Sequence, residues 1–180
     1  MTDRVGLRDL GERICITGPS GSGKSTLADA VGSALGLPVV HLDRYRHVLG
    51  THWELRPDAE FERLHSAAVD GDRWVLDGNY STLLPARLER ATGIIVLEIS
   101  TARTLVGYVR RTLRRGDRAG GLGVDERLSW RFVRYNLRNG ASNRRRRRHV
   151  FDEAVLPKVL LVGARRIRDF VRAEGLRTRR

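Results

Sequence analysis

The chain has 180 residues, 41% hydrophobic and 31% charged, which is enough for one globular domain with a hydrophobic core. Its single cysteine, Cys15, excludes an intrachain disulfide framework, and no apolar run approaches the roughly 20 residues that cross a bilayer. No signal-peptide core follows the N-terminus, so we expect a cytoplasmic protein without a membrane partner.

The formal charge of +13 is unevenly distributed along the chain. Residues 1–100 carry 11 basic and 14 acidic side chains, a net charge of −3, whereas residues 101–180 carry 23 and 7, a net charge of +16. This basic second half predicts attraction to phosphate groups, carried either by nucleotides or by nucleic acid.

Apolar strands and amphipathic helices alternate along the chain. We expect strands over residues 13–17, 39–42, 74–76, 94–99 and 158–162, and helices over residues 24–35, 58–69, 102–115 and 165–172. The alternation predicts an α/β fold in which helices cover both faces of a mostly parallel sheet. Because ligands bind beyond the carboxyl ends of such strands, Gly18 onward, Asp43, Asp77 and Ser100 are candidate site positions.

The pattern changes after residue 115. Four glycines between residues 116 and 123 predict a loop, helical spacing returns over 125–137, and Asn139-Gly140 is expected to end that helix. We therefore expect one domain over residues 1–180. Its core would span about 12–115 and 155–175, with a lid insertion at about 116–154.

The strongest local signal is a glycine-rich loop between the first strand and the first helix. Residues 18–25 read Gly-Pro-Ser-Gly-Ser-Gly-Lys-Ser and fit the pattern G-x-x-x-x-G-K-[ST]. Glycines let backbone N–H groups surround a phosphate, and the helix N-terminus adds its positive dipole. Lys24 would reach the β- and γ-phosphates of ATP, and the Ser25 hydroxyl would ligate Mg²⁺. The predicted nucleotide-binding residues are Gly18, Pro19, Ser20, Gly21, Ser22, Gly23, Lys24, Ser25 and Thr26.

Two carboxylates are predicted to end strands beside this loop. Asp77 follows Trp74-Val75-Leu76 and would hold Mg²⁺ directly or through water, the alternative being an ordinary Asp-Gly turn. Asp43 follows His41-Leu42 and would accept the proton of an incoming hydroxyl or orient the acceptor, the alternative being a helix cap or loop residue. The five histidines show no zinc-type spacing, which favours surface or hydrogen-bonded roles.

Two arginine clusters follow in the basic half. Arg110 and Arg114 share one helix stripe and Arg111 and Arg115 another, so one or two of them are candidates to stabilise a transferred phosphoryl group; the alternative is a solvated basic face. The run of residues 144–148 fits three interpretations: a lid that closes on phosphates, a nucleic-acid patch or a solvated surface.

Several short motifs together resemble the bacterial topology modulation proteins, which are adenylate-kinase-related P-loop proteins. The resemblance spans about residues 12–172. Besides the glycine loop, it rests on His41-Leu42-Asp43, Trp53, Asp77-Gly78-Asn79 with Tyr80, and Arg87-Leu88-Glu89-Arg90-Ala91.

This resemblance implies a three-layer P-loop NTPase fold like that of the nucleoside monophosphate kinases, with a five-stranded parallel sheet in the order 2-3-1-4-5 and a helical lid. It also implies that Asp77 is the magnesium-associated carboxylate and that Asn79 and Tyr80 face the acceptor. Arg111 and Arg114 would belong to the lid.

The leading hypothesis from the sequence is a kinase that transfers the γ-phosphoryl group of Mg-ATP to a small acceptor, such as a nucleotide, a nucleoside or a related metabolite. Its catalytic residues would be Lys24, Asp43, Arg111 and Arg114. One alternative is a nucleic-acid-binding P-loop ATPase or ATP-dependent regulator that affects DNA topology. Another is a nucleotide-binding module without catalysis.

Overall fold

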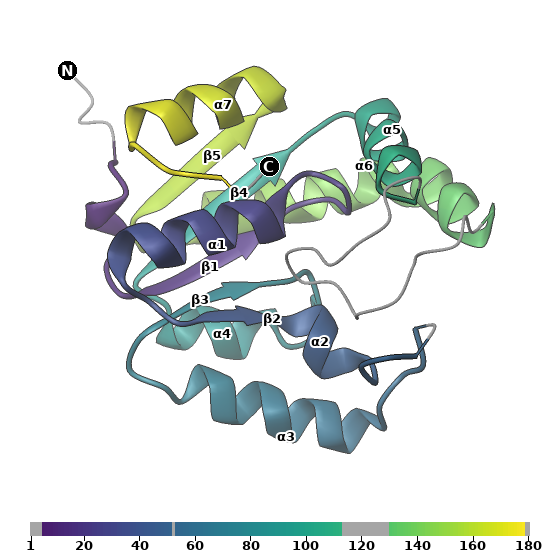
Figure 1. Ribbon diagram of the computed structural model, residues 1–180, viewed down its shortest axis with the longest axis horizontal. Helices are drawn as coiled ribbons and strands as arrows, with labels where there is room; N and C mark the ends of the chain where they lie inside the picture. Colours follow the sequence, from purple (N-terminus) through teal and green to yellow (C-terminus); the bar gives the residue numbers. More distant parts are fainter. Residues whose placement is uncertain (1–4, 52, 113–129, 179–180) are drawn as a thin grey trace.

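The computed structural model describes residues 5–51, 53–112 and 130–178. A parallel five-stranded sheet in the order β2-β3-β1-β4-β5 forms its centre (Figure 1). The strands are β1 (Arg13–Thr17), β2 (Val39–His41), β3 (Trp74–Asp77), β4 (Gly93–Glu98) and β5 (Lys158–Val162). This arrangement confirms the α/β fold class expected from the alternating pattern and the sheet order implied by the family resemblance.

A short 3-10 helix and seven α-helices accompany the sheet in the described residues. They are η1 (Arg8–Leu10), α1 (Lys24–Leu35), α2 (Leu42–Arg46), α3 (Asp58–Val69), α4 (Leu84–Arg90), α5 (Thr101–Thr112), α6 (Trp130–Glu153) and α7 (Gly163–Ala173). None of the described helices is long and apolar enough to span a membrane.

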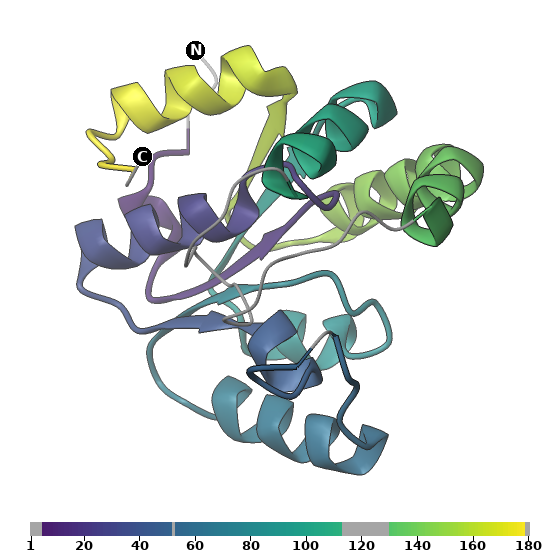
Figure 2. The ribbon, with the colours of Figure 1, turned by 45° about the vertical axis from the view of Figure 1, so that its right-hand side comes forward.

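The sheet is the middle of three layers (Figures 1 and 2). Helices α1 and α7 cover one face, where Leu27 and Phe170 join one buried cluster. Helices α3, α4 and α6 cover the other face, where Phe61 is buried in a second cluster and Val150 packs against it. All six residues of β4 are buried because both faces of this strand are covered, which explains its continuous apolar run.

The strand predicted over 39–42 is shorter in the structure, and this shifts Asp43. Strand β2 ends at His41, and Leu42 begins α2, so Asp43 lies in the first turn of a five-residue helix rather than at a strand tip. Helices α2 and α4, with five and seven residues, were not predicted, because so few residues do not establish a helical period.

The predicted helix end at Asn139-Gly140 is wrong, since α6 continues through these residues to Glu153. A Cβ atom on Gly140 would lie 2.6 Å from Thr101 Oγ1, so glycine here allows α6 to approach the start of α5 closely. The arginines at 144–148 therefore lie on a helix whose later part packs on the sheet. Residues 116–129, which carry the predicted glycine loop of the lid, lie outside the described residues.

Candidate functional site

The glycine-rich loop connects the end of β1 to the start of α1. Gly21 and Gly23 have φ angles of 75° and 88°, in the left-handed region that favours glycine. A Cβ atom on Gly18 would lie 2.8 Å from Leu97 Cβ, so only glycine lets the loop lie this close to β4. These glycines give residues 18–23 the close turn on which the predicted phosphate cradle depends.

Lys24, Ser25 and Asp77 come together at the mouth of this loop. The Ser25 hydroxyl donates a hydrogen bond of 2.6 Å to Asp77 Oδ2, and Lys24 Nζ donates across the loop to the Pro19 carbonyl oxygen at 3.4 Å. Asp77 is the last residue of β3, in register with Ile16 and His41 on the neighbouring strands, and only 4% of it is exposed.

His41 joins the Asp77 carboxylate to α1. Its Nδ1 atom lies 3.2 Å from Asp77 Oδ2, and its Nε2 atom lies 2.9 Å from Asp29 Oδ1. Burial lowers the pKa of His41, but the two carboxylates outweigh this effect and raise the pKa above its ordinary value. The sequence predicted only a surface or hydrogen-bonded role for this histidine.

The same contacts keep Asp77 ionised. Burial raises the pKa of this carboxyl group, yet hydrogen bonds from His41 and Ser25, together with the charge of Lys24, hold the pKa below its ordinary value. The second oxygen, Asp77 Oδ1, is buried and has no hydrogen-bond partner among the described residues. It is therefore an oxygen ligand with unused capacity.

The oxygens of Ser25 and Asp77 fit Mg²⁺, a hard cation that prefers oxygen ligands. Among the described residues, no group of three or more His, Cys, Asp or Glu side chains is arranged to hold a metal ion. A magnesium ion at this position would therefore complete its coordination shell with phosphate oxygens and water, as is usual when the protein supplies only one or two ligands.

Asn79 ties the residues that follow β3 to the glycine-rich loop. Its Oδ1 atom accepts hydrogen bonds from Thr17 Oγ1 at 3.0 Å and from the Gly18 backbone N–H at 3.2 Å. Because a backbone N–H can only donate, the oxygen of the amide must face Gly18. The Nδ2 group of this exposed side chain is therefore a donor on its other side.

Tyr80 connects the same segment to α2. Its hydroxyl donates a hydrogen bond of 2.7 Å to Asp43 Oδ1. Burial, followed by the charge of Asp43, raises the pKa of Tyr80 above its ordinary value, so the phenol stays protonated.

A buried arginine holds the backbone of this segment. Arg87 on α4 is 1% exposed and donates to the carbonyl oxygens of Gly78, Asn79 and Tyr80 at 2.9, 3.1 and 2.9 Å. Burial lowers the pKa of Arg87, and the charges around it oppose that effect. The sequence placed Arg87 only within a family-like motif. In the structure Arg87 lies three residues after the buried Leu84, on the inner face of α4.

A pocket of about 450 Å³ opens beside the loop, bounded by the segment after β3 and by α4, α5 and α6. The residues that line it are Thr17, Pro19, Ser20, Asn79, Tyr80, Ser81, Leu84, Pro85, Leu88, Ile99, Thr101, Thr104, Gly140, Asn143, Arg146, Arg147 and Val150.

Two of the predicted acceptor residues line this pocket and one does not. Asn79 and Tyr80 are in its wall, whereas Asp43 lies behind the Tyr80 hydroxyl and is not part of the lining. Helix α2 begins before Asp43 and turns its carboxylate toward Tyr80. That Asp43 borders the acceptor cleft stays a prediction. Trp53 also lies away from the lining and packs edge-on against His47, with 4.8 Å between the ring centroids.

The predicted lid arginines cannot be compared with this geometry. Arg111 belongs to α5, but its side chain lies outside the described part of the structure, as does the whole of Arg114. Instead, Arg146 and Arg147 of α6 line the pocket. The sequence analysis considered residues 144–148 as one run. Had a helix been expected there, its period would have placed the five arginines on different faces.

The chain is similar in structure to solved proteins, whereas no model of a protein family matches its sequence and neither does any curated protein. A gluconokinase from Sinorhizobium meliloti 1021 superposes with a TM-score of 0.55 at 14% identity, over 93% of this chain and 91% of the other. A shikimate kinase from Aquifex aeolicus vf5 aligns with a TM-score of 0.45 at 18% identity, over 82% and 86%. Together with the sheet order, the first similarity shows that this chain has the P-loop kinase fold.

Proposed function

We propose that this protein is a kinase that transfers the γ-phosphoryl group of Mg-ATP to a small acceptor. The observation that carries the proposal is the hydrogen bond of 2.6 Å between Ser25 and the buried Asp77, at the mouth of a glycine loop that carries Lys24. A turn that matched the glycine pattern by chance would not be expected beside an ionised carboxylate with one oxygen that has no hydrogen-bond partner among the described residues.

In this proposal the backbone N–H groups of residues 18–26 hold the ATP phosphates, and Lys24 stabilises charge on the β- and γ-phosphates. Ser25 and Asp77 would hold Mg²⁺, which neutralises phosphate oxygens when bound. His41 keeps the Asp77 carboxylate in position through its own contact with Asp29.

The acceptor occupies the pocket next to the loop. Its hydroxyl oxygen forms a bond to the γ-phosphorus, the bond from that phosphorus to the bridging oxygen breaks, and ADP leaves with the electron pair. The proton of the acceptor hydroxyl passes to Tyr80, which gives its own proton to Asp43 across their hydrogen bond of 2.7 Å. Asn79 orients the acceptor from the same wall.

We further propose that residues 116–154 form a lid that brings Arg111 and Arg114 onto the transferred group and excludes water. The same proposal has three further parts. The chain is a member of the topology modulation proteins, its acceptor is a nucleotide, a nucleoside or a related metabolite, and its location is cytoplasmic.

The experiment that tests the function is product analysis after incubation with Mg-ATP and a panel of small hydroxyl and phosphate compounds. The wild-type chain should form ADP and one phosphorylated product. Lys24→Ala should abolish transfer and leave the circular dichroism spectrum unchanged, because Lys24 is partly exposed and its one hydrogen bond to the described residues is long. Ser33→Ala, an exposed change on the same helix, is the matched control.

Unchanged turnover in Lys24→Ala would overturn the proposal. So would calorimetry that detects no binding of Mg-ATP or Mg-GTP to the folded wild-type protein.

A further inference from the structure

One stripe of α6 forms a wall of the pocket. Gly140, Asn143, Arg146, Arg147 and Val150 all line it and are spaced three, three, one and three residues apart. This spacing places them on one face of a helix. The arginine run is therefore divided by the helix, and only two of its five members are pocket residues.

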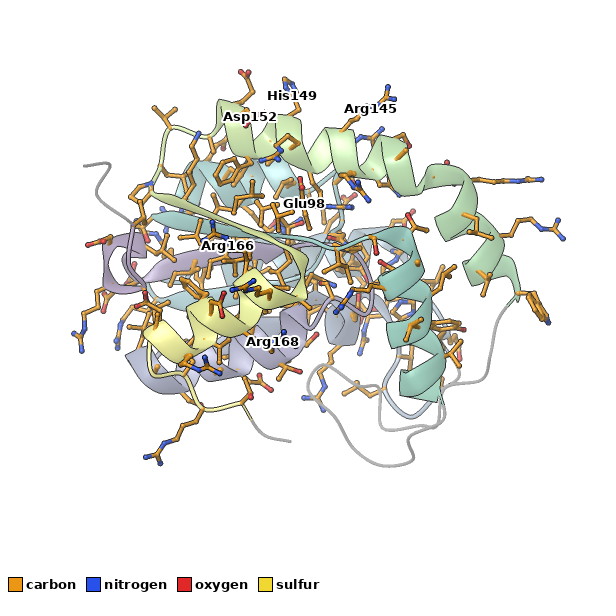
Figure 3. The ribbon with its side chains drawn as sticks, turned by 90° about the horizontal axis from the view of Figure 1, so that it is seen from above. Glu98, Arg145, His149, Asp152, Arg166 and Arg168 are labelled. Carbon is orange, nitrogen blue, oxygen red and sulfur yellow. The ribbon has the colours of Figure 1, made fainter. Side chains whose placement is uncertain are left out.

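The opposite face of α6 points away from the sheet. Figure 3 shows Arg145, His149 and Asp152 projecting from the outer side of the helix, while Glu98 lies beneath it. Arg145 and Arg146 are thus neighbours in sequence with different surroundings, which makes Arg145 a natural control for Arg146.

The positive charge facing the pocket is only partly balanced. No Asp or Glu is among the described residues that line the pocket. The buried Glu98, at the end of β4, has its Oε1 atom 3.5 Å from Arg148 Nε, and its charge also acts on Arg147. One carboxylate thus faces two guanidinium groups of the helix.

Within the described part of the chain, both pocket arginines have guanidinium donors without a hydrogen-bond partner. Arg147 Nε is buried without a hydrogen-bond partner within the described residues. The described contacts include no hydrogen bond or ion pair of Arg146, which is exposed on the pocket side of the helix. Guanidinium donors without partners in a partly enclosed pocket are suited to a carboxylate or a phosphate.

The remainder of the lining suits the rest of a small polar molecule. Asn79, Asn143, Thr101 and Thr104 offer amide and hydroxyl groups, and Leu84, Leu88 and Val150 offer an apolar surface for a carbon skeleton. The Thr17, Pro19 and Ser20 side of the pocket belongs to the strand end and loop that would carry the ATP phosphates.

From these observations we infer that the acceptor is a small hydroxylated anion, whose carboxylate or phosphate group is held by Arg146 and Arg147 while its hydroxyl faces the glycine loop. This inference rests on the proposed function and adds the chemical class of the substrate. The anionic group takes no part in bond making, so the transfer balances as written above: the hydroxyl oxygen gains the phosphoryl group, ADP departs and the proton passes through Tyr80 to Asp43.

The test uses inorganic phosphate as the anion probe and the full chain loaded with Mg²⁺ and a non-hydrolysable ATP analogue, so that the glycine loop is already filled. Calorimetry should show one phosphate site per chain. Arg146→Ala should weaken phosphate binding by about 10-fold or more, the equivalent of one charge-assisted hydrogen bond, and Arg145→Ala should leave it unchanged. Arg147→Lys, which keeps the charge opposite Glu98, should also weaken it.

Three results would overturn the inference. The first is that the loaded wild-type chain does not bind phosphate. The second is that Arg145→Ala and Arg146→Ala have equal effects. The third is that Arg146→Ala loses binding of the analogue rather than of phosphate, which would assign the arginines to the nucleotide. Binding of the analogue is measured in its own titration. If the wild-type protein does not bind the analogue, the proposed function itself is wrong. If it binds the analogue but not phosphate, only the inference that the acceptor is an anion is wrong.

Discussion

At the scale of single residues, the hydrogen bond between Tyr80 and Asp43 lets us predict how substitutions of these two residues change kcat. Asp43 is not among the residues that line the pocket, but it accepts a hydrogen bond from Tyr80, which is, so in the proposed function the two groups form one proton path. Tyr80→Phe and Asp43→Asn should each lower kcat by about 100-fold or more, and the double variant should be no worse than either single one. Steady-state kinetics measures this, with Tyr45→Phe on α2 as the control. Additive losses would show that the two residues act separately.

The contacts of Arg87 predict that its substitution lowers the unfolding free energy. Arg87→Leu leaves three carbonyl oxygens, of Gly78, Asn79 and Tyr80, without their donor, so we expect a loss of about 2–4 kcal/mol of unfolding free energy. Arg90→Leu on the same helix is the control. Arg90 is exposed and donates to one carbonyl oxygen, of Asp70, so its loss should cost about 1 kcal/mol or less. Urea denaturation compares the two, and equal losses would contradict the role given to Arg87.

The residues of the site differ in how far the sequence could identify them. Lys24 and Ser25 belong to a contiguous pattern, and Asp77 follows an apolar strand, so local sequence is enough to bring them together. The partners of Asp43, Arg87 and His41 are set by how helices pack on the sheet. No short pattern encodes those distances, so these contacts are visible only in the folded chain.

At the scale of the elements, the crossing of α5 and α6 can be tested through Gly140. Helix propensity alone predicts that Gly140→Ala stabilises the protein by about 1 kcal/mol. The structure predicts the opposite sign, because the new Cβ atom would lie 2.6 Å from Thr101 Oγ1. Thermal denaturation should show a lower midpoint for Gly140→Ala and recovery when Thr101→Ala is added. A higher midpoint for Gly140→Ala would show that α5 and α6 can move apart to fit the new Cβ atom without a loss of stability.

The sequence predicted best those elements whose hydrophobic pattern is long and regular, and it failed at Gly140. Long periodic segments such as α1 and α3, and the apolar strands, were placed to within about one residue, because their pattern repeats over several turns or pairs. Asn139-Gly140 was taken as a helix end because these residues usually break helices. A contact with Thr101, distant in sequence, made glycine the suitable residue inside a helix instead.

At the scale of the whole molecule, stability should depend on pH through His65. This residue is 2% exposed, and burial, followed by the charge of Arg87, lowers its pKa from 6.5 to about 4. Between pH 6.5 and 4 the unfolded chain therefore binds a proton at His65 that the folded chain does not. Stability contributed by the neutral ring is present above pH 6.5 and is lost as the pH falls toward 4.

His65→Phe should remove this dependence, which amounts to at most about 1.4 kcal/mol per pH unit. Urea denaturation at several pH values between 4 and 7 measures the slope. His149→Phe is the control, because His149 lies on the outer face of α6 (Figure 3) and should leave the slope unchanged. An identical slope in His65→Phe and wild type would show that another group titrates.

Asn79 contacts the end of β1 and the glycine-rich loop through Thr17 and Gly18 and also lies in the wall of the neighbouring pocket. A molecule that shifts this amide on one side must therefore alter the fit on the other. Thermodynamic reciprocity then requires that each ligand change the affinity of its companion by the same factor. If the protein is the proposed kinase, its nucleotide and acceptor sites would thus be coupled through a single side chain, before any larger movement of the protein takes place.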